Sequence, residues 1–208
     1  MNKDNLHQIF NYYIEKFDFL NSEPHTEYYK WQICKQYPTL MSEALNANDD
    51  TFAAKLYEVK KCTRNIIDSY LFKQNSHSVS SYLFLNDPEN HYMYKATQCR
   101  DFADCVEYYS DWGSGDNIKL DVFYRMMDEM IEEISNCKEL LETDKSRFDG
   151  RLNLPGGEIH QDINKHILAF DIIYCFSSYN LYGGINYTKR NMKEKKLYLE
   201  MVAKKIKH

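Results

Sequence analysis

The chain has 208 residues, of which 43% are hydrophobic and 27% charged, and its net charge is −5. A chain of this length buries roughly 70% of its unfolded surface, so a single domain needs no disulfide staple. The low content of Gly (7) and Pro (4) favours helices and argues against a turn-rich β-sandwich.

The sequence predicts a cytoplasmic protein without a membrane span. Its polar first residues run straight into an amphipathic pattern, which is unlike a signal peptide. The most apolar stretch, Ile167 to Phe176, is interrupted by Asp171 and is too short to cross a bilayer. Six dispersed cysteines, with no Cys-x-x-Cys pair, are expected to be reduced, buried thiols. They are Cys34, Cys62, Cys99, Cys105, Cys137 and Cys175.

Apolar side chains spaced by three and four residues predict amphipathic helices along most of the chain. In chain order, these helices are expected over residues 6–20, 26–36, a segment from about 40, 52–70, 78–85, 97–109, 120–141 and 163–182, followed by a helical tail. Alternating aromatics over residues 91–95 predict a short strand or an extended connector. We therefore expect an all-α or mostly α domain of about eight to ten helices, with at most a small two-stranded element.

Charge is distributed unevenly along this chain. Residues 189–208 contain eight Lys or Arg against two Glu, a net charge of +6, which leaves −11 for residues 1–188. An acidic body slows the approach of a polyphosphate, so nucleic acid would bind only at a local basic patch. The expected organisation is a helical domain over residues 1–187 and a basic C-terminal helix or tail over residues 188–208.

No phosphate-binding loop of the type G-x-x-x-x-G-K-[ST] occurs in the sequence. One candidate metal site consists of His160, Asp162 and His166, because imidazole and carboxylate groups can share a divalent ion. The alternative is that these His and Asp residues cap the helix that follows. A group of four carboxylates is interpreted as a solvated acidic helix face. Its members are Asp128, Glu129, Glu132 and Glu133.

A mixture of aromatic and cationic residues suggests a nucleic-acid contact. Tyr94 and Trp112 are the candidates for stacking on bases, and Lys95 and Arg100 are candidates for phosphate contact. The same residue types also pack cores and cover them with amphipathic stems. In the basic tail, the candidates for phosphate contact are Lys189, Arg190 and Lys193.

The run Pro88-Glu89-Asn90-His91-Tyr92-Met93-Tyr94-Lys95, followed by Arg100-Asp101-Phe102-Ala103, resembles a segment of the N-terminal region of McrB-like type IV restriction proteins. Tyr29-Lys30-Trp31 and the stretch from His166 to Tyr174 fit the same pattern, so the resemblance covers most of residues 1–187. In that family this region is a target-sensing module ahead of a GTP-hydrolysing AAA+ motor, and a separate subunit cuts. This chain has no motor, so neither GTP hydrolysis nor cutting is implied.

The leading functional hypothesis is a non-enzymatic recognition or adaptor module of a bacterial restriction or anti-phage defence system, without a cofactor. Its expected partners are DNA, an AAA+ GTPase or nuclease subunit, or a second copy of the chain, and not a membrane. One alternative is a metal-dependent nuclease centred on His160, Asp162 and His166. The other is a purely structural or protein-interaction role.

Overall fold

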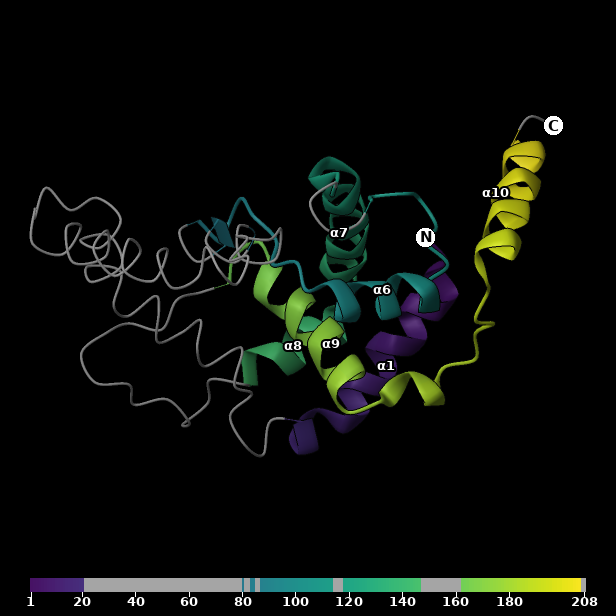
Figure 1. The fold of residues 1–208 in the computed structure, drawn as a ribbon. Helices are drawn as coiled ribbons and strands as arrows, with labels where there is room; N and C mark the ends of the chain where they lie inside the picture. The colour runs from purple at the N-terminus through teal and green to yellow at the C-terminus, as the bar shows by residue number, and fades with distance from the viewer. Residues whose placement is uncertain (21–79, 81–82, 85–86, 114–117, 147–161, 207–208) are drawn as a thin grey trace, which may run out of the picture.

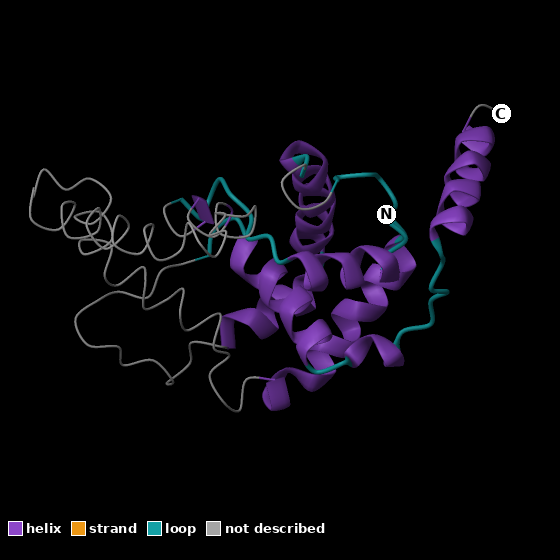
Figure 2. Cartoon of the chain, in the orientation of Figure 1, coloured by secondary structure: helices purple, strands orange, loops and turns teal. Residues whose placement is uncertain are grey.

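The computed structural model describes residues 1–20, 80, 83–84, 87–113, 118–146 and 162–206. Within these ranges the chain forms α-helices, one short 3-10 helix and no strand (Figure 2). The elements are α1 (Lys3–Leu20), α6 (Ala96–Cys105), α7 (Leu120–Asn136), α8 (Lys138–Ser146), α9 (His166–Ser178), η2 (Leu181–Gly184) and α10 (Met192–Ile206). The expectation of a mostly helical protein is therefore confirmed.

The described ranges hold six α-helices and one 3-10 helix, fewer than the eight to ten helices expected for the whole chain. The helices expected over residues 26–36, from about 40, and over 52–70 lie outside the described residues, as does most of the one over 78–85. None of the described helices is both long enough and apolar enough to pass through a bilayer.

Helix α9 is the centre of the body. Ten of its 13 residues are buried, which is the pattern of a helix enclosed on all sides. It contacts α1, α6, α7 and η2, and Figure 1 shows it between these elements. Its apolar side chains, such as Leu168 and Phe176, join α1 and α7 in one core. The apolar run seen in the sequence is therefore a central helix with partners on every side.

Helices α1 and α7 show the amphipathic spacing predicted for them. The apolar stripe of α1 is buried, with Leu6, Ile9 and Tyr13 fully inaccessible to solvent. The stripe of α7 is buried in the same way, including Phe123, Met126, Met127, Met130 and Ile134. Each apolar stripe faces α9 or α8. The opposite faces of α1 and α7 are polar, as is typical of helices that cover a core.

One long helix was expected over residues 120–141, and this prediction is wrong. Helix α7 ends at Asn136, Cys137 adopts a non-helical backbone (φ −94°, ψ 88°), and α8 begins at Lys138. The apolar periodicity continues across the break because Leu140 also points into the core. The hydrophobic pattern therefore does not reveal a change in chain direction when the helices before and after it bury their apolar residues in the same core.

Residues 91–95 form an extended connector. Its middle is fixed by Ser80, whose Oγ accepts a hydrogen bond from the Tyr94 N–H (3.1 Å). The Ser80 hydroxyl also lies 3.3 Å from the Tyr94 carbonyl oxygen. Tyr92, Met93 and Tyr94 are all buried, so the connector is part of the core.

The helix expected over residues 163–182 is shorter in the structure. Helix α9 ends at Ser178, Asn180 has a left-handed backbone (φ 54°), and η2 follows. The chain then leads to α10, which stands apart from the other helices (Figure 1). This helix begins with a capping box, because Asn191 Oδ1 accepts from the Glu194 N–H while Glu194 accepts from the Asn191 N–H. The predicted helical tail is thus confirmed over residues 192–206.

Candidate functional site: a cleft between the C-terminal helix and the body

Helix α10 is attached to the body through a small set of charged contacts. Arg190, just before the helix, forms an ion pair with Glu107 and donates to the Tyr109 hydroxyl (3.0 Å). The Tyr198 hydroxyl donates to Glu107 over 2.9 Å. One turn earlier on α10, Lys195 forms an ion pair with Asp104. We call the group of Glu107, Arg190, Tyr109 and Tyr198 the latch.

Glu107 lies at the centre of the latch. Burial alone would raise the pKa of its carboxyl group, but hydrogen bonds from Asn2, Arg190 and Tyr198 outweigh burial and lower this pKa. The carboxylate is thus ionised at neutral pH. Glu107 also has a left-handed backbone (φ 54°), which turns the chain sharply after α6. This turn places the carboxylate beside the connection to α10.

A cleft of about 280 Å³ lies between α10 and the segment from Arg100 on α6 to Trp112. Its walls come from two parts of the chain that are about 80 residues apart in sequence. The lining residues are Arg100, Ala103, Asp104, Tyr108, Tyr109, Ser110, Asp111, Trp112, Met192, Lys195, Lys196 and Leu199. The fold therefore brings three cations, two carboxylates and three aromatic rings around one opening.

Two of these cations have no carboxylate partner within 4 Å among the described residues. Arg100 lies over the Trp112 ring (5.6 Å from guanidinium to centroid), donates to the Gly113 carbonyl oxygen and remains exposed. Lys196 is exposed on the opposite wall. Both positive charges are therefore available to an anion in the cleft.

The two carboxylates of the cleft are already compensated. Asp104 pairs with Lys195, and Asp111 pairs with Lys119 (3.2 Å) and accepts from the Gly113 N–H (2.9 Å). The side chains that line the cleft carry a net charge of +1, although residues 1–188 as a whole are acidic. The cleft is thus a local basic site on an acidic protein.

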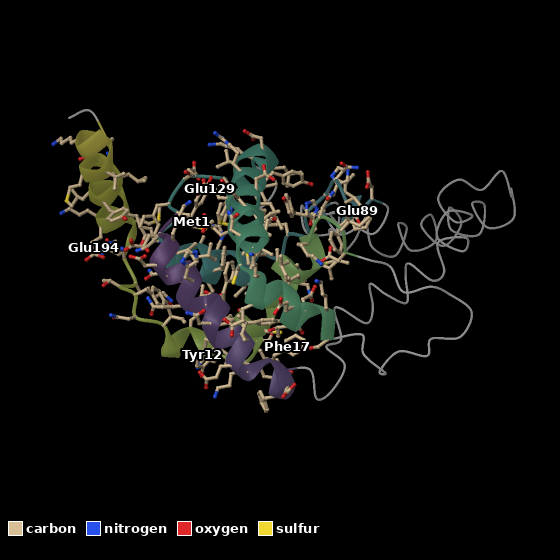
Figure 3. The ribbon with its side chains drawn as sticks, turned by 180° about the vertical axis from the view of Figure 1, so that it is seen from behind. Met1, Tyr12, Phe17, Glu89, Glu129 and Glu194 are labelled. Carbon is tan, nitrogen blue, oxygen red and sulfur yellow. The ribbon has the colours of Figure 1, made fainter. Side chains whose placement is uncertain are left out.

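The side of α10 turned away from the cleft forms a second surface. Lys193, Leu197, Met201 and Lys204 are spaced by four, four and three residues, which places them along one side of the helix. Leu197 is 52% exposed and Met201 57% exposed. We call these four residues the outer face. Figure 3 shows α10 from behind, with Glu194 near its N-terminal end.

The structure places the two predicted stacking residues in the core. Tyr94 is 2% exposed and packs against Phe123, with ring centroids 5.2 Å apart. Trp112 is 4% exposed and lies between Tyr108 and Phe123. Neither ring offers a free face to a base, which corrects that part of the sequence prediction.

The predicted phosphate contacts divide into two groups. Lys95 lies over the rings of Tyr174 (4.9 Å) and Phe170 (5.8 Å). Arg190 is held in the latch, so its charge is already used. In contrast, Arg100 faces the cleft, and Lys189 and Lys193 are exposed beside or on α10.

The described residues do not form the candidate metal site. Asp162 accepts hydrogen bonds from the N–H groups of Ile167 (3.2 Å) and Leu168 (2.9 Å), so both of its oxygens cap α9. His166 Nδ1 lies 3.0 Å from the His91 carbonyl oxygen and donates to it. His160 lies outside the described residues. Across the described ranges, no group of three or more His, Cys, Asp or Glu is arranged to hold a metal ion.

The predicted acidic face of α7 is only partly solvated. Glu133 lies between α1 and α7, where it accepts hydrogen bonds from Lys3 (2.6 Å) and His7 (2.9 Å). Glu129 contacts the amino group of Met1 (3.2 Å; Figure 3). Since Lys3 and His7 belong to α1 and Met1 directly precedes it, these contacts of the α7 carboxylates help to join the two helices.

Sequence reasoning missed the latch residues Glu107, Tyr109 and Tyr198 and the cleft residue Lys196. Each belongs to a common residue type without a motif, and the partners lie more than 80 positions apart in the sequence. Comparison of the chain with protein-family models, curated proteins and solved structures found no match.

Proposed function

We propose that the chain is a non-enzymatic recognition module that binds nucleic acid through α10 and the adjoining cleft. The observation that carries this proposal is a group of exposed cations on and beside α10 and in the adjoining cleft, none with a carboxylate partner within 4 Å in the described structure. They are Arg100, Lys189, Lys193, Lys196 and Lys204. Phosphate groups bind such cations by displacing condensed counterions, and this term dominates nonspecific affinity.

The acidic character of the remaining chain makes this basic surface selective. A negative body repels a polyphosphate, so binding is confined to the side of the molecule that carries α10. Two ion pairs restrict nucleic-acid binding further, because Glu107 neutralises Arg190 and Asp104 neutralises Lys195. The resemblance of residues 88–103 to McrB-like proteins supports placing this module in a bacterial restriction or anti-phage defence system.

Fluorescence anisotropy with labelled single-stranded and duplex DNA, repeated at several salt concentrations, tests this proposal. Each engaged Lys should add about one to the slope of log affinity against log salt. We therefore expect the double variant Lys193→Gln with Lys196→Gln to reduce that slope by roughly two. The matched control is Lys138→Gln with Lys145→Gln, which changes two exposed lysines of α8. Absence of binding at the lowest salt concentration would remove the proposal.

A second candidate function is the binding of a partner subunit through the outer face of α10. Four of the seven exposed large hydrophobic side chains in the described residues lie on this helix, and two of them, Leu197 and Met201, belong to the outer face, whereas Met192 and Leu199 line the cleft. Exposed apolar residues grouped on one element are typical of protein interaction sites. Pairing of two outer faces would bring lysines together, which favours a different, acidic protein over a second copy.

This second function predicts a hetero-complex with the product of a gene that neighbours its own, such as an AAA+ GTPase or a nuclease. The variant Leu197→Glu with Met201→Glu should weaken such a complex while the body stays folded. A strictly monomeric sedimentation profile for the chain mixed with these products would contradict it.

A further inference from the structure

We propose that the cleft between α10 and α6 is a binding site for a single mononucleotide, held by its phosphate and by its planar base. This inference deepens the proposed function and partly rests on it, because the nucleotide can be free or can be the phosphorylated end of a strand. The shared chemistry is a phosphate monoester on a sugar that also carries a planar aromatic base.

The positions of the two unpaired cations carry the argument for the phosphate. Arg100 comes from α6 and Lys196 from α10, so an anion between them is contacted from both walls. Lys195 adds a third cation, which it shares with Asp104. Because Asp111 is compensated by Lys119 and by a backbone N–H, it does not cancel the attraction. Arg and Lys together are the usual protein ligands of phosphate.

The form of the Arg100 side chain carries the argument for a planar base. Its guanidinium is positioned in advance by the Gly113 carbonyl oxygen and by the Trp112 ring below it, yet it remains exposed. Bases stack on guanidinium planes as they do on aromatic rings.

The size of the cleft limits the ligand. Sites for drug-sized molecules have volumes of about 300–1,000 Å³. A cleft of about 280 Å³ lies just below this range and therefore suits one nucleotide and not a duplex. Met192 and Leu199 complete the α10 wall with apolar surface, which suits the ring and not the phosphate.

The test uses AMP as the probe, with adenosine and inorganic phosphate as its two halves. Isothermal titration of the full chain should show saturable binding of AMP that is at least tenfold tighter than binding of either half. The chain has only two tryptophans, Trp31 and Trp112, so a Trp31→Phe variant leaves Trp112 as the sole indole reporter. Its fluorescence should change with the same midpoint as the titration heat.

Three variants locate the site. Arg100→Gln and Lys196→Gln should each weaken AMP binding about tenfold, the value expected for loss of one hydrogen bond to a charged group. Lys138→Gln on α8 is the matched control and should bind as the unmodified chain does. Equal affinity for AMP and adenosine, or unchanged binding in both cleft variants, would overturn the proposal.

Short oligonucleotides separate the two sources of the nucleotide and distinguish this inference from the proposed function. A 5′-phosphorylated oligothymidine that competes with AMP better than its unphosphorylated form assigns the site to a strand end. If neither oligonucleotide competes with AMP, the site is assigned to a free nucleotide. Oligonucleotide binding without any AMP binding would overturn the cleft assignment while leaving the proposed function in place.

Discussion

Tyr13 on α1 and Asp171 on α9 form a buried hydrogen bond in the centre of the protein. The phenol oxygen of Tyr13 donates to Asp171 Oδ2 over 2.6 Å, and both side chains are almost completely inaccessible to solvent. A carboxylate placed in an apolar helix would be costly without such donors. This contact therefore explains how α9 accommodates an acid within its otherwise apolar run.

We expect Tyr13→Phe to lower the free energy of unfolding by about 1–3 kcal/mol, because a donor to a buried carboxylate is lost. The measurement is urea denaturation followed by circular dichroism. The control is Tyr12→Phe, because Tyr12 is only partly buried and packs its ring against Phe176. Equal stability of the two variants would show that the Tyr13 hydroxyl contributes nothing.

The Asp162 carboxyl group gives a pH-dependent contribution to stability. Burial raises its pKa from the ordinary 3.8 to about 6, although two N–H groups of α9 act in the opposite direction. Asp144 and Lys165 are the charged groups beside it. Because the folded state holds the proton more tightly, this contribution is complete below pH 3.8 and is lost as the pH rises through about 6.

The variant Asp162→Asn isolates this effect. The stability of the unmodified chain relative to Asp162→Asn should fall by about 2 kcal/mol between pH 4 and pH 7, at about 1.4 kcal/mol per pKa unit. Denaturation at a series of pH values measures the difference. Asp18→Asn changes an exposed carboxylate of α1 and is the control. A difference that is flat, or that grows with pH, is inconsistent with this prediction.

The latch should control the local stability of α10. In Glu107→Gln the charge that holds Arg190 is lost, so amide exchange in α10 should accelerate by tenfold or more. Hydrogen exchange with mass spectrometry measures this, and α9 serves as the internal reference. Glu142→Gln alters an exposed residue of α8 and should leave α10 unchanged. Equal amide exchange rates of α10 in the two variants would mean that the latch does not stabilise this helix.

Thiol reactivity should follow burial. Burial raises the pKa of both Cys99 and Cys105 to about 12, so their reactive thiolate form is scarce at pH 8. Cys175 is also buried, whereas Cys137 is only partly so. We expect iodoacetamide to modify Cys137 at least tenfold faster than Cys99, Cys105 or Cys175, as read by peptide mapping. Comparable rates at Cys99 and Cys137 would contradict the packing of α6.

The sequence predicted those features that depend on local pattern. The spacing of Leu6, Ile9 and Tyr13 is sufficient to predict α1, and the role of Asp162 as a helix cap follows from its place before α9. The break at Cys137 could not be predicted, because it changes the direction of the chain without interrupting the apolar period.

The cleft and the latch depend on contacts between distant segments. Glu107 and Arg190 are 83 positions apart, and no local signal connects them. The burial of Trp112 could not be predicted from the sequence either, since a tryptophan beside an arginine occurs both in cores and at binding surfaces. Only the structure shows that the Arg100 guanidinium lies over the Trp112 ring and is the group exposed to solvent there.

The order in which the helices are synthesised also matters. Helix α1 is synthesised before α9, yet Tyr13 must find Asp171, which is 158 positions further along the chain. At 5–20 residues per second, this delay is roughly 8–30 s. Until α8 and α9 have been synthesised, the apolar stripe of α1 lacks the two helices that cover it. The nascent chain should therefore depend on chaperones during translation more than its modest size suggests.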